Sequence, residues 1–145
     1  TQIQDIAAIG GATFNANNSL DNGNNSGWNF VAPTPTNYYW VNNTGNWSDG
    51  THWATTSGGG GSGCVPTKQD NVFFDANSFT GGPTRTVTIN VDANCNTMNW
   101  TGINTAGSRV LAGVTARSLQ IYGSLILNTG MTNSYNGRIF FKSEG

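Results

Sequence analysis

Few residues of this chain could carry out catalysis. It contains one histidine, His52, two cysteines, Cys64 and Cys95, and seven acidic residues. A serine or cysteine nucleophile needs a base within hydrogen-bonding reach, and no sequence signature places either residue type beside His52. Glycoside hydrolysis needs two carboxylates, and Glu144 is the only glutamate, so that pair would have to consist of aspartates. We therefore predict that the protein is not an enzyme and that His52 packs or hydrogen-bonds beside Trp53.

The spacing between the two cysteines, Cys64 and Cys95, matches no zinc or redox motif. Cys64 follows a flexible Gly/Ser tract at 57–63, and Cys95 lies near a strand-like run. For a secreted protein we predict a disulfide bond between them, with two unpaired thiols as the alternative. Closing a loop of this length would stabilise the fold by about 3–4 kcal/mol in the chain-entropy model.

Three aspartates are weak candidates for calcium ligands, and no other cofactor is expected. Asp21 opens an Asn- and Gly-rich stretch with oxygen ligands at alternate positions, whereas Asp70 and Asp75 flank a short apolar run. The further acids and the closing glutamate of a tight calcium site are missing. We expect all three carboxylates to cap turns through hydrogen bonds, with Ca²⁺ binding as the alternative.

The composition excludes some classes of partner. Charged residues make up 9% of the chain, against a usual level of about 25%, and the net charge is −1 without a basic run. Nucleic-acid binding needs clustered Lys and Arg, so it is not expected. No apolar run approaches the roughly 20 residues that span a bilayer. The chain starts without Met and lacks a signal peptide at 1–5, which favours a mature product or a piece of a longer protein.

The elements that position these residues are predicted to be short β-strands. Gly, Asn and Thr recur every few residues and would break most helices. The run Thr86–Val91 alternates, which puts Val87, Ile89 and Val91 on one face of a strand. The other strand-like runs are 71–75, 118–122, 124–127 and 138–142. We therefore predict an all-β fold.

A weak repeat in the C-terminal half suggests how the strands are arranged. The steps from Met98 to Leu119, from Leu119 to Ile139 and from Ile89 to Val110 are nearly equal. A period of about 20 positions with apolar alternation is typical of a parallel β-solenoid, whose rungs bury their apolar residues only by stacking. A β-sandwich is the alternative, because its strands also recur at short, regular intervals.

The prolines divide the chain. The segment 31–37 contains two prolines at alternate positions and is expected to form an extended linker. The segment 1–30 would then be the closing strand segment of a preceding module, or an exchanged strand. The segment 38–145 would be a Trp-rich β cap that opens a solenoid, incomplete at its last rung.

Four tryptophans have two interpretations. They are Trp40, Trp47, Trp53 and Trp100. An aromatic side chain buries roughly 150–250 Å², and few aliphatic residues near the first three could fill an interior. We therefore expect a structural core of aromatic rings, with stacking on glycans as the alternative.

A series of different motifs follows along the chain: Tyr39–Trp53, Val65–Thr67 after a Gly-rich loop, Asp70–Phe79, Val87–Val91, Cys95, Met98–Gly102 and Ile121–Leu125. Together they resemble a module of very large secreted, adhesin-like surface proteins of Bacteroidota-like and environmental bacteria. The segment Gly11–Phe30 resembles the closing segment of the preceding module in such proteins. The resemblance implies a cell-surface location and the opening rungs of a β-solenoid, and it carries over no catalytic residue.

These observations predict a non-enzymatic extracellular module with a structural or adhesive role. An incomplete solenoid leaves strand edges unpaired, so we expect head-to-tail filament assembly, in which one chain's N-terminal segment adds strands to the next chain. The expected partners are copies of the chain or adjacent modules, and surface glycans. The alternatives are a carbohydrate-binding module and a virion or phage-fibre segment.

Overall fold

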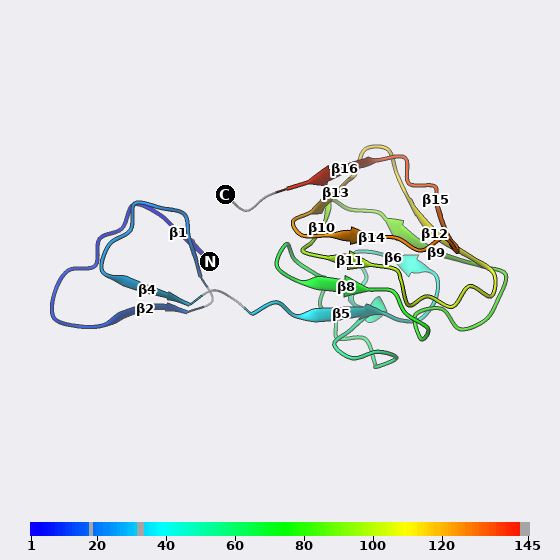
Figure 1. The fold of residues 1–145 in the computed structure, drawn as a ribbon, viewed down its shortest axis with the longest axis horizontal. Coiled ribbons are helices and arrows are strands. Elements are labelled where there is room, and N and C mark those ends of the chain that lie inside the picture. Colours follow the sequence, from blue (N-terminus) through cyan, green and yellow to red (C-terminus); the bar gives the residue numbers. More distant parts are fainter. Residues whose placement is uncertain (18, 32–33, 143–145) are drawn as a thin grey trace. The chain divides into compact units, whose positions relative to one another are not determined.

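The protein is all-β, as the sequence predicts. The computed structural model describes residues 1–17, 19–31 and 34–142, and the one helical element there is a 3-10 turn, η1 (Gly50–His52). Across these ranges, no helix has the length and apolar character needed to cross a membrane. The chain divides into an N-terminal unit, Thr1–Pro35, and a C-terminal unit, Thr36–Gly145 (Figure 1).

The N-terminal unit consists of two stacked turns of chain. Strand β1 (Gln2–Ile3) pairs in parallel with β3 (Leu20–Asp21), and β2 (Phe14–Asn17) pairs in parallel with β4 (Trp28–Val31). A parallel bridge between Ala7 and Ser26 joins the turns at a third point. The stretch expected to be a closing or exchanged strand segment, 1–30, is thus divided among four short strands, because each turn of chain bends after a few residues.

The C-terminal unit is built from twelve short strands in its described part. They are β5 (Asn37–Trp40), β6 (Gly45–Asn46), β7 (Trp53–Ala54), β8 (Asn71–Phe73), β9 (Thr84–Ile89), β10 (Ala93–Cys95), β11 (Met98–Asn99), β12 (Ser108–Gly113), β13 (Ser118–Ile121), β14 (Leu125–Ile126), β15 (Met131–Asn133) and β16 (Arg138–Phe141). They form three sheets with the orders β14-β11-β8-β5-β7, β15-β12-β9-β6 and β10-β13-β16.

From β8 to β16, strands that follow one another in the chain belong to different sheets, and every third strand returns to the same sheet. All pairings are parallel except the one between β5 and β7. Figure 1 shows β5, β8, β11 and β14 stacked in this way. Each turn of the chain therefore adds one strand to each of three sheets around a common interior.

The repeat suggested by the sequence is confirmed for only one pair of strands. Leu119 of β13 lies opposite Ile139 of β16, as predicted. Met98 does not pair with Leu119 but lies between Val72 of β8 and Leu125 of β14, so its partners are farther away in the chain than predicted. The interval varies because the loops between strands differ in length, whereas the strands themselves stay in register.

The interior is mostly apolar and is filled from all three sheets. The side chains expected to share a face do so: Val87 and Ile89 of β9 are fully buried, and Val91, just after the strand, packs partly against the core. Leu119 and Ile121 of β13 are also fully buried. Alternation along each strand thus separates a core face from an outer face.

The two ends of the C-terminal unit differ. At the end that is first in the chain, β7 covers the edge of β5 through an antiparallel pairing between Trp40 and Trp53. At the other end, β14, β15 and β16 are each the last strand of their sheet. The boundary between the two units, after Pro35, falls inside the linker predicted at 31–37. The end of that linker belongs to the C-terminal unit, because Thr36 bonds with Asp70 and Asn71; residues 32–33 lie outside the described ranges.

Candidate functional site

The four predicted core tryptophans are all fully buried, with 0% exposure. Trp53 packs edge-on against Trp47 at 4.7 Å and against Trp40 at 4.9 Å between ring centroids, and Trp100 stacks on Phe74 at 3.8 Å. They are structural residues, and the alternative that these rings stack on glycans is wrong for this structure, because no ring face reaches the surface.

The indole N–H groups of this cluster are satisfied unequally. The Nε1 of Trp40 donates to the Asn43 carbonyl at 2.6 Å, and the Nε1 of Trp53 donates to the Trp47 carbonyl at 2.9 Å. The Nε1 atoms of Trp47 and Trp100 are buried without a hydrogen-bond partner. Such a buried, unpaired donor costs stability.

His52 is a packing residue, as expected, although its main neighbour is not Trp53. Its ring stacks on Trp40 with centroids 4.7 Å apart, and its Nδ1 lies 2.8 Å from the Val41 carbonyl oxygen. Asp49 is 4.0 Å from its Nε2, but that carboxylate is hydrogen-bonded to Thr51. The imidazole is therefore held between a tryptophan face and a backbone carbonyl.

The predicted disulfide between Cys64 and Cys95 is not formed, and both cysteines are free. Cys95 lies on a core-facing position of β10 opposite Ile121, and burial raises the pKa of its thiol to about 12. Cys64 is exposed. The pKa of the Tyr38 hydroxyl is raised by burial, by the charges of Asp70 and Cys64, and by a hydrogen bond with Cys64. The prediction is wrong because sequence spacing does not reveal that one thiol faces the interior and the other the surface.

The three aspartates considered as calcium ligands accept hydrogen bonds from the chain itself. Asp21 accepts from the Gly23 amide and the Asn25 side chain. Asp70 accepts from Thr36 and Thr67, and Asp75 caps a turn by accepting from the amides of residues 77 and 78. No group of three metal-ligating residues occurs among the residues that the structure describes. These carboxylates organise turns, which is the role the sequence favours.

Arg109 is a buried residue that the sequence did not reveal. Its side chain is fully buried on β12 and donates to the carbonyls of Asn104 and Ala106 at 2.8 and 2.6 Å. Its guanidinium also lies 5.5 Å from the centre of the Phe79 ring. Backbone carbonyls and a ring face thus replace the carboxylate that a buried arginine usually needs. Arg109 stabilises the loop before β12 and is not accessible to a ligand.

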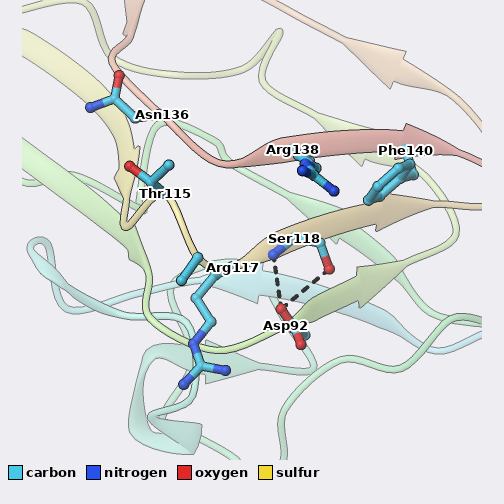
Figure 2. A pocket seen from close by; sticks show the side chains of 8 residues that line it. Asp92, Thr115, Arg117, Ser118, Asn136, Arg138 and Phe140 are labelled. Atoms are coloured by element: carbon cyan, nitrogen blue, oxygen red, sulfur yellow. Dashed lines mark hydrogen bonds between the residues drawn. The ribbon is translucent and has the colours of Figure 1, made fainter.

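An open groove of about 520 Å³ lies where β13 and β16 begin. Its lining comprises Asp92, Thr115, Ala116, Arg117, Ser118, Asn136, Arg138 and Phe140. Figure 2 shows Arg138 and Phe140 on β16, and the Arg117 guanidinium extending from the loop before β13. The amide and hydroxyl of Ser118 donate to Asp92 at 2.9 and 3.2 Å.

The groove suits anion binding better than acid–base chemistry. It contains one carboxylate, Asp92, which Ser118 already engages, and glycoside hydrolysis needs two. Arginine side chains are the usual partners of carboxylates and sulfates because their N–H groups form a planar fork. The sequence did not point to this groove, since its residues come from three separate stretches of the chain.

The unpaired ends of the three sheets form a second candidate site. We call the outer sides of β14, β15 and β16 the open edge; none of these sides has a partner strand in the described part of the chain. Ile126, Leu127 and Phe141, within or just after these strands, are 39%, 50% and 66% exposed. Unpaired N–H and C=O groups beside apolar side chains can accept a further strand.

No protein-family model, curated protein or solved structure gave a significant match to this chain. Its two candidate sites therefore have to be interpreted from their own geometry.

Proposed function

We propose that the protein is a non-enzymatic structural module of an extracellular or cell-surface assembly, and that further strands add to its open edge. In this proposal the C-terminal unit is a short parallel β-solenoid. The observation that carries the proposal is the contrast between its two ends. At one end β7 turns back antiparallel to β5 over the buried tryptophan cluster, with β6 and β10 as the other edge strands, whereas at the other end the unpaired strands β14, β15 and β16 lie beside exposed apolar side chains.

The energetics favour addition at this edge. A turn of parallel strands cannot bury its apolar side chains alone and is stabilised by the next turn. Each exposed apolar side chain at the edge, such as Phe141, would contribute on the order of 1–3 kcal/mol if fully buried. Pairing would also satisfy the outward N–H and C=O groups of three strands at once.

The proposed occupant is the N-terminal unit of a second copy. It has the same construction, because its turns are joined by parallel pairings at three points. Its turns are also short. Paired residues are far apart in the chain between β10 and β13 (Ala93 with Leu119), closer between β13 and β16 (Ser118 with Arg138), and closest between β2 and β4 (Phe14 with Trp28). The turns of the N-terminal unit are therefore as short as expected for turns that would follow β16 in the same stack.

The polarity also fits. In the described part of the N-terminal unit each two-stranded sheet has two free sides, and the sides that would meet the open edge are those of β1 and β2, which precede the second turn in the chain. The open edge follows the rest of its own chain. Joining the two continues the chain direction, so the contact is head-to-tail and produces an open filament. Low charge, the abundance of Asn, Gly and Thr, and the resemblance to modules of secreted surface proteins support an extracellular location.

Sedimentation velocity of the full chain over a wide concentration range tests the proposal. We expect the average mass of the wild type to rise with concentration. Phe141→Lys places a charge on the open edge and should keep the protein monomeric. Val114→Lys is the matched control, because Val114 is 53% exposed and follows β12, an internal strand of its sheet, so it should assemble like the wild type.

A single sharp monomer of the wild type at high concentration would overturn the assembly. Equal loss of assembly in both variants would also contradict it, since the effect would then reflect added charge and not the edge. Circular dichroism of each variant should match the wild type, which shows that the fold is intact.

A further inference from the structure

The outer face of the β10-β13-β16 sheet has a chemistry that the structural role does not explain. Leu119 and Ile121 of β13 point into the core, so alternation places the intervening residues on the outside. Tyr122 continues this outer row, since its hydroxyl lies 3.4 Å from the Gln120 side-chain oxygen. Strand pairing extends the rows across the sheet: Asn94 is beside Gln120, and Gln120 is beside Phe140. We call this surface, with the groove where β13 and β16 begin, the outer face.

Most of the chain's cations lie on the outer face. Lys68 stands 5.6 Å from the centre of the Tyr122 ring, and Lys142 stands 5.3 Å from the centre of the Phe140 ring. Arg138 and Arg117 line the groove. These four are two thirds of the six basic residues in a chain of net charge −1.

The remaining two arginines are held elsewhere by backbone groups. Arg109 is fully buried against carbonyls, and Arg85 donates to the carbonyls of Gly81 and Thr80. The basic residues are therefore distributed unevenly. Arg85 and Arg109 bond to carbonyls of the loops before β9 and β12, and the other four lie on the outer face.

Few negative charges balance them. Asp92 is the one exposed carboxylate in the described part of the outer face, and it already accepts hydrogen bonds from Ser118. Asp70 lies nearby, because its carbonyl accepts from the Asn96 amide, but its carboxylate is buried and bonded to Thr36 and Thr67. The outer face thus carries a positive excess on a protein that is slightly acidic as a whole.

We propose that the outer face binds an acidic polysaccharide through its carboxylate or sulfate groups. Arg138 offers a planar fork for one acidic group in the groove, Lys142 offers a point charge farther along the sheet, and Lys68 adds to the positive field there. The amides of Asn94 and Gln120 can bond hydroxyl groups between these charges, and Phe140, 39% exposed, can pack against a sugar ring.

Charge spacing favours a polysaccharide over nucleic acid. Duplex DNA carries one negative charge per about 1.7 Å and is bound by dense Lys and Arg clusters. The outer face has four cations, of which Arg138 lies on β16 and the others lie in loops beside the sheet, with uncharged amides between them. This pattern matches a polymer whose acidic groups are separated by hydroxyl-bearing units. The site lies on a sheet face and not on the open edge, so it does not depend on strand addition.

Calorimetric titration of the full chain tests the proposal with four probes: polygalacturonate, dextran sulfate, neutral dextran and a thymidine oligonucleotide. We expect binding to polygalacturonate or dextran sulfate that weakens as salt rises, and none to neutral dextran. Arg138→Gln should lower the affinity by about tenfold, since it removes a charge-assisted hydrogen bond. Arg85→Gln makes the same charge change away from the outer face and should leave the affinity within about twofold.

Three outcomes would overturn the proposal. One is the absence of binding to both acidic polymers. Another is an equal loss of affinity in Arg138→Gln and Arg85→Gln, which would mean that net charge alone attracts the polymer. The third is tighter binding of the oligonucleotide than of either acidic polysaccharide, which would assign the outer face to nucleic acid. Thermal unfolding of both variants checks that neither change disturbs the fold.

Discussion

Trp47 and Trp53 allow the energetics of the aromatic core to be tested with one kind of substitution at two sites. Both rings are fully buried and touch each other, with centroids 4.7 Å apart. Trp53 donates its indole N–H to the Trp47 carbonyl at 2.9 Å, whereas the indole N–H of Trp47 has no partner. Replacing each by Phe removes a similar volume but has the opposite effect on hydrogen bonding.

The expected free-energy changes differ in size. Loss of part of a buried ring costs about 1–2 kcal/mol in either variant, from the transfer of one to two carbon groups and the small cavity left behind. Trp53→Phe also leaves the Trp47 carbonyl without a donor, which costs about 1–3 kcal/mol more. Trp47→Phe removes an unsatisfied donor and recovers a similar amount. Trp53→Phe should therefore be the less stable variant by at least about 2 kcal/mol.

Urea unfolding followed by far-UV circular dichroism measures this difference. The two variants and the wild type should unfold with the same dependence on denaturant, so that midpoints can be compared directly. Equal destabilisation of the two variants, within about 0.5 kcal/mol, would refute the reasoning. It would mean that the Trp47 indole N–H is satisfied after all or that the bond from Trp53 contributes nothing.

Two further predictions concern Cys95 and Gly45. Burial raises the pKa of the Cys95 thiol from 9.0 to about 12, so its contribution to stability is fully present below pH 9 and is lost as pH rises toward 12. The free energy of unfolding should fall by up to about 1.4 kcal/mol per pH unit in that window. Urea titrations of Cys95→Ala should show a shallower fall with pH. The same fall in the variant and the wild type would contradict the role of the Cys95 thiol. A side chain at Gly45 would collide with the His52 ring, whereas Gly60 faces open space. Gly45→Ala should therefore lower stability by about 1–3 kcal/mol and Gly60→Ala should not; similar melting temperatures for the two variants would contradict this.

The sequence predicts strands more reliably than it predicts their pairing. Val87 and Ile89 are core residues because alternation along a strand is a local property that the sequence displays directly. The pairing of Met98 with Leu125 could not be read in the same way, because it depends on how far the intervening loops travel before the chain returns to the sheet. Since β13 returns to β16 after a shorter path than β11 takes to β14, no fixed period describes both sheets.

The prediction for Val110 is wrong for a different physical reason. The repeat suggested that Val110 faces the core, but the adjacent Arg109 and Leu111 are the buried residues of β12. The sequence pattern does not predict an arginine at a core-facing position, since burial of a charge is costly. It is tolerated here because the carbonyls of Asn104 and Ala106 accept its N–H groups, and a loop's carbonyl directions are not visible in the sequence.

The two proposals involve different surfaces of the β10-β13-β16 sheet, its edge and its outer face, so each can be tested independently of the other. Strand addition would extend the sheet beyond β16 through backbone groups, whereas the outer face would bind a polymer through side chains that project from the sheet. Phe141 and Phe140 illustrate the division, because neighbouring residues of a strand point to opposite faces. Lys142 stands over the Phe140 ring on the outer face, so Phe141→Lys, which tests the edge, leaves that contact in place. A variant that no longer assembles but still binds an acidic polysaccharide would thus separate the structural role of the chain from its recognition role.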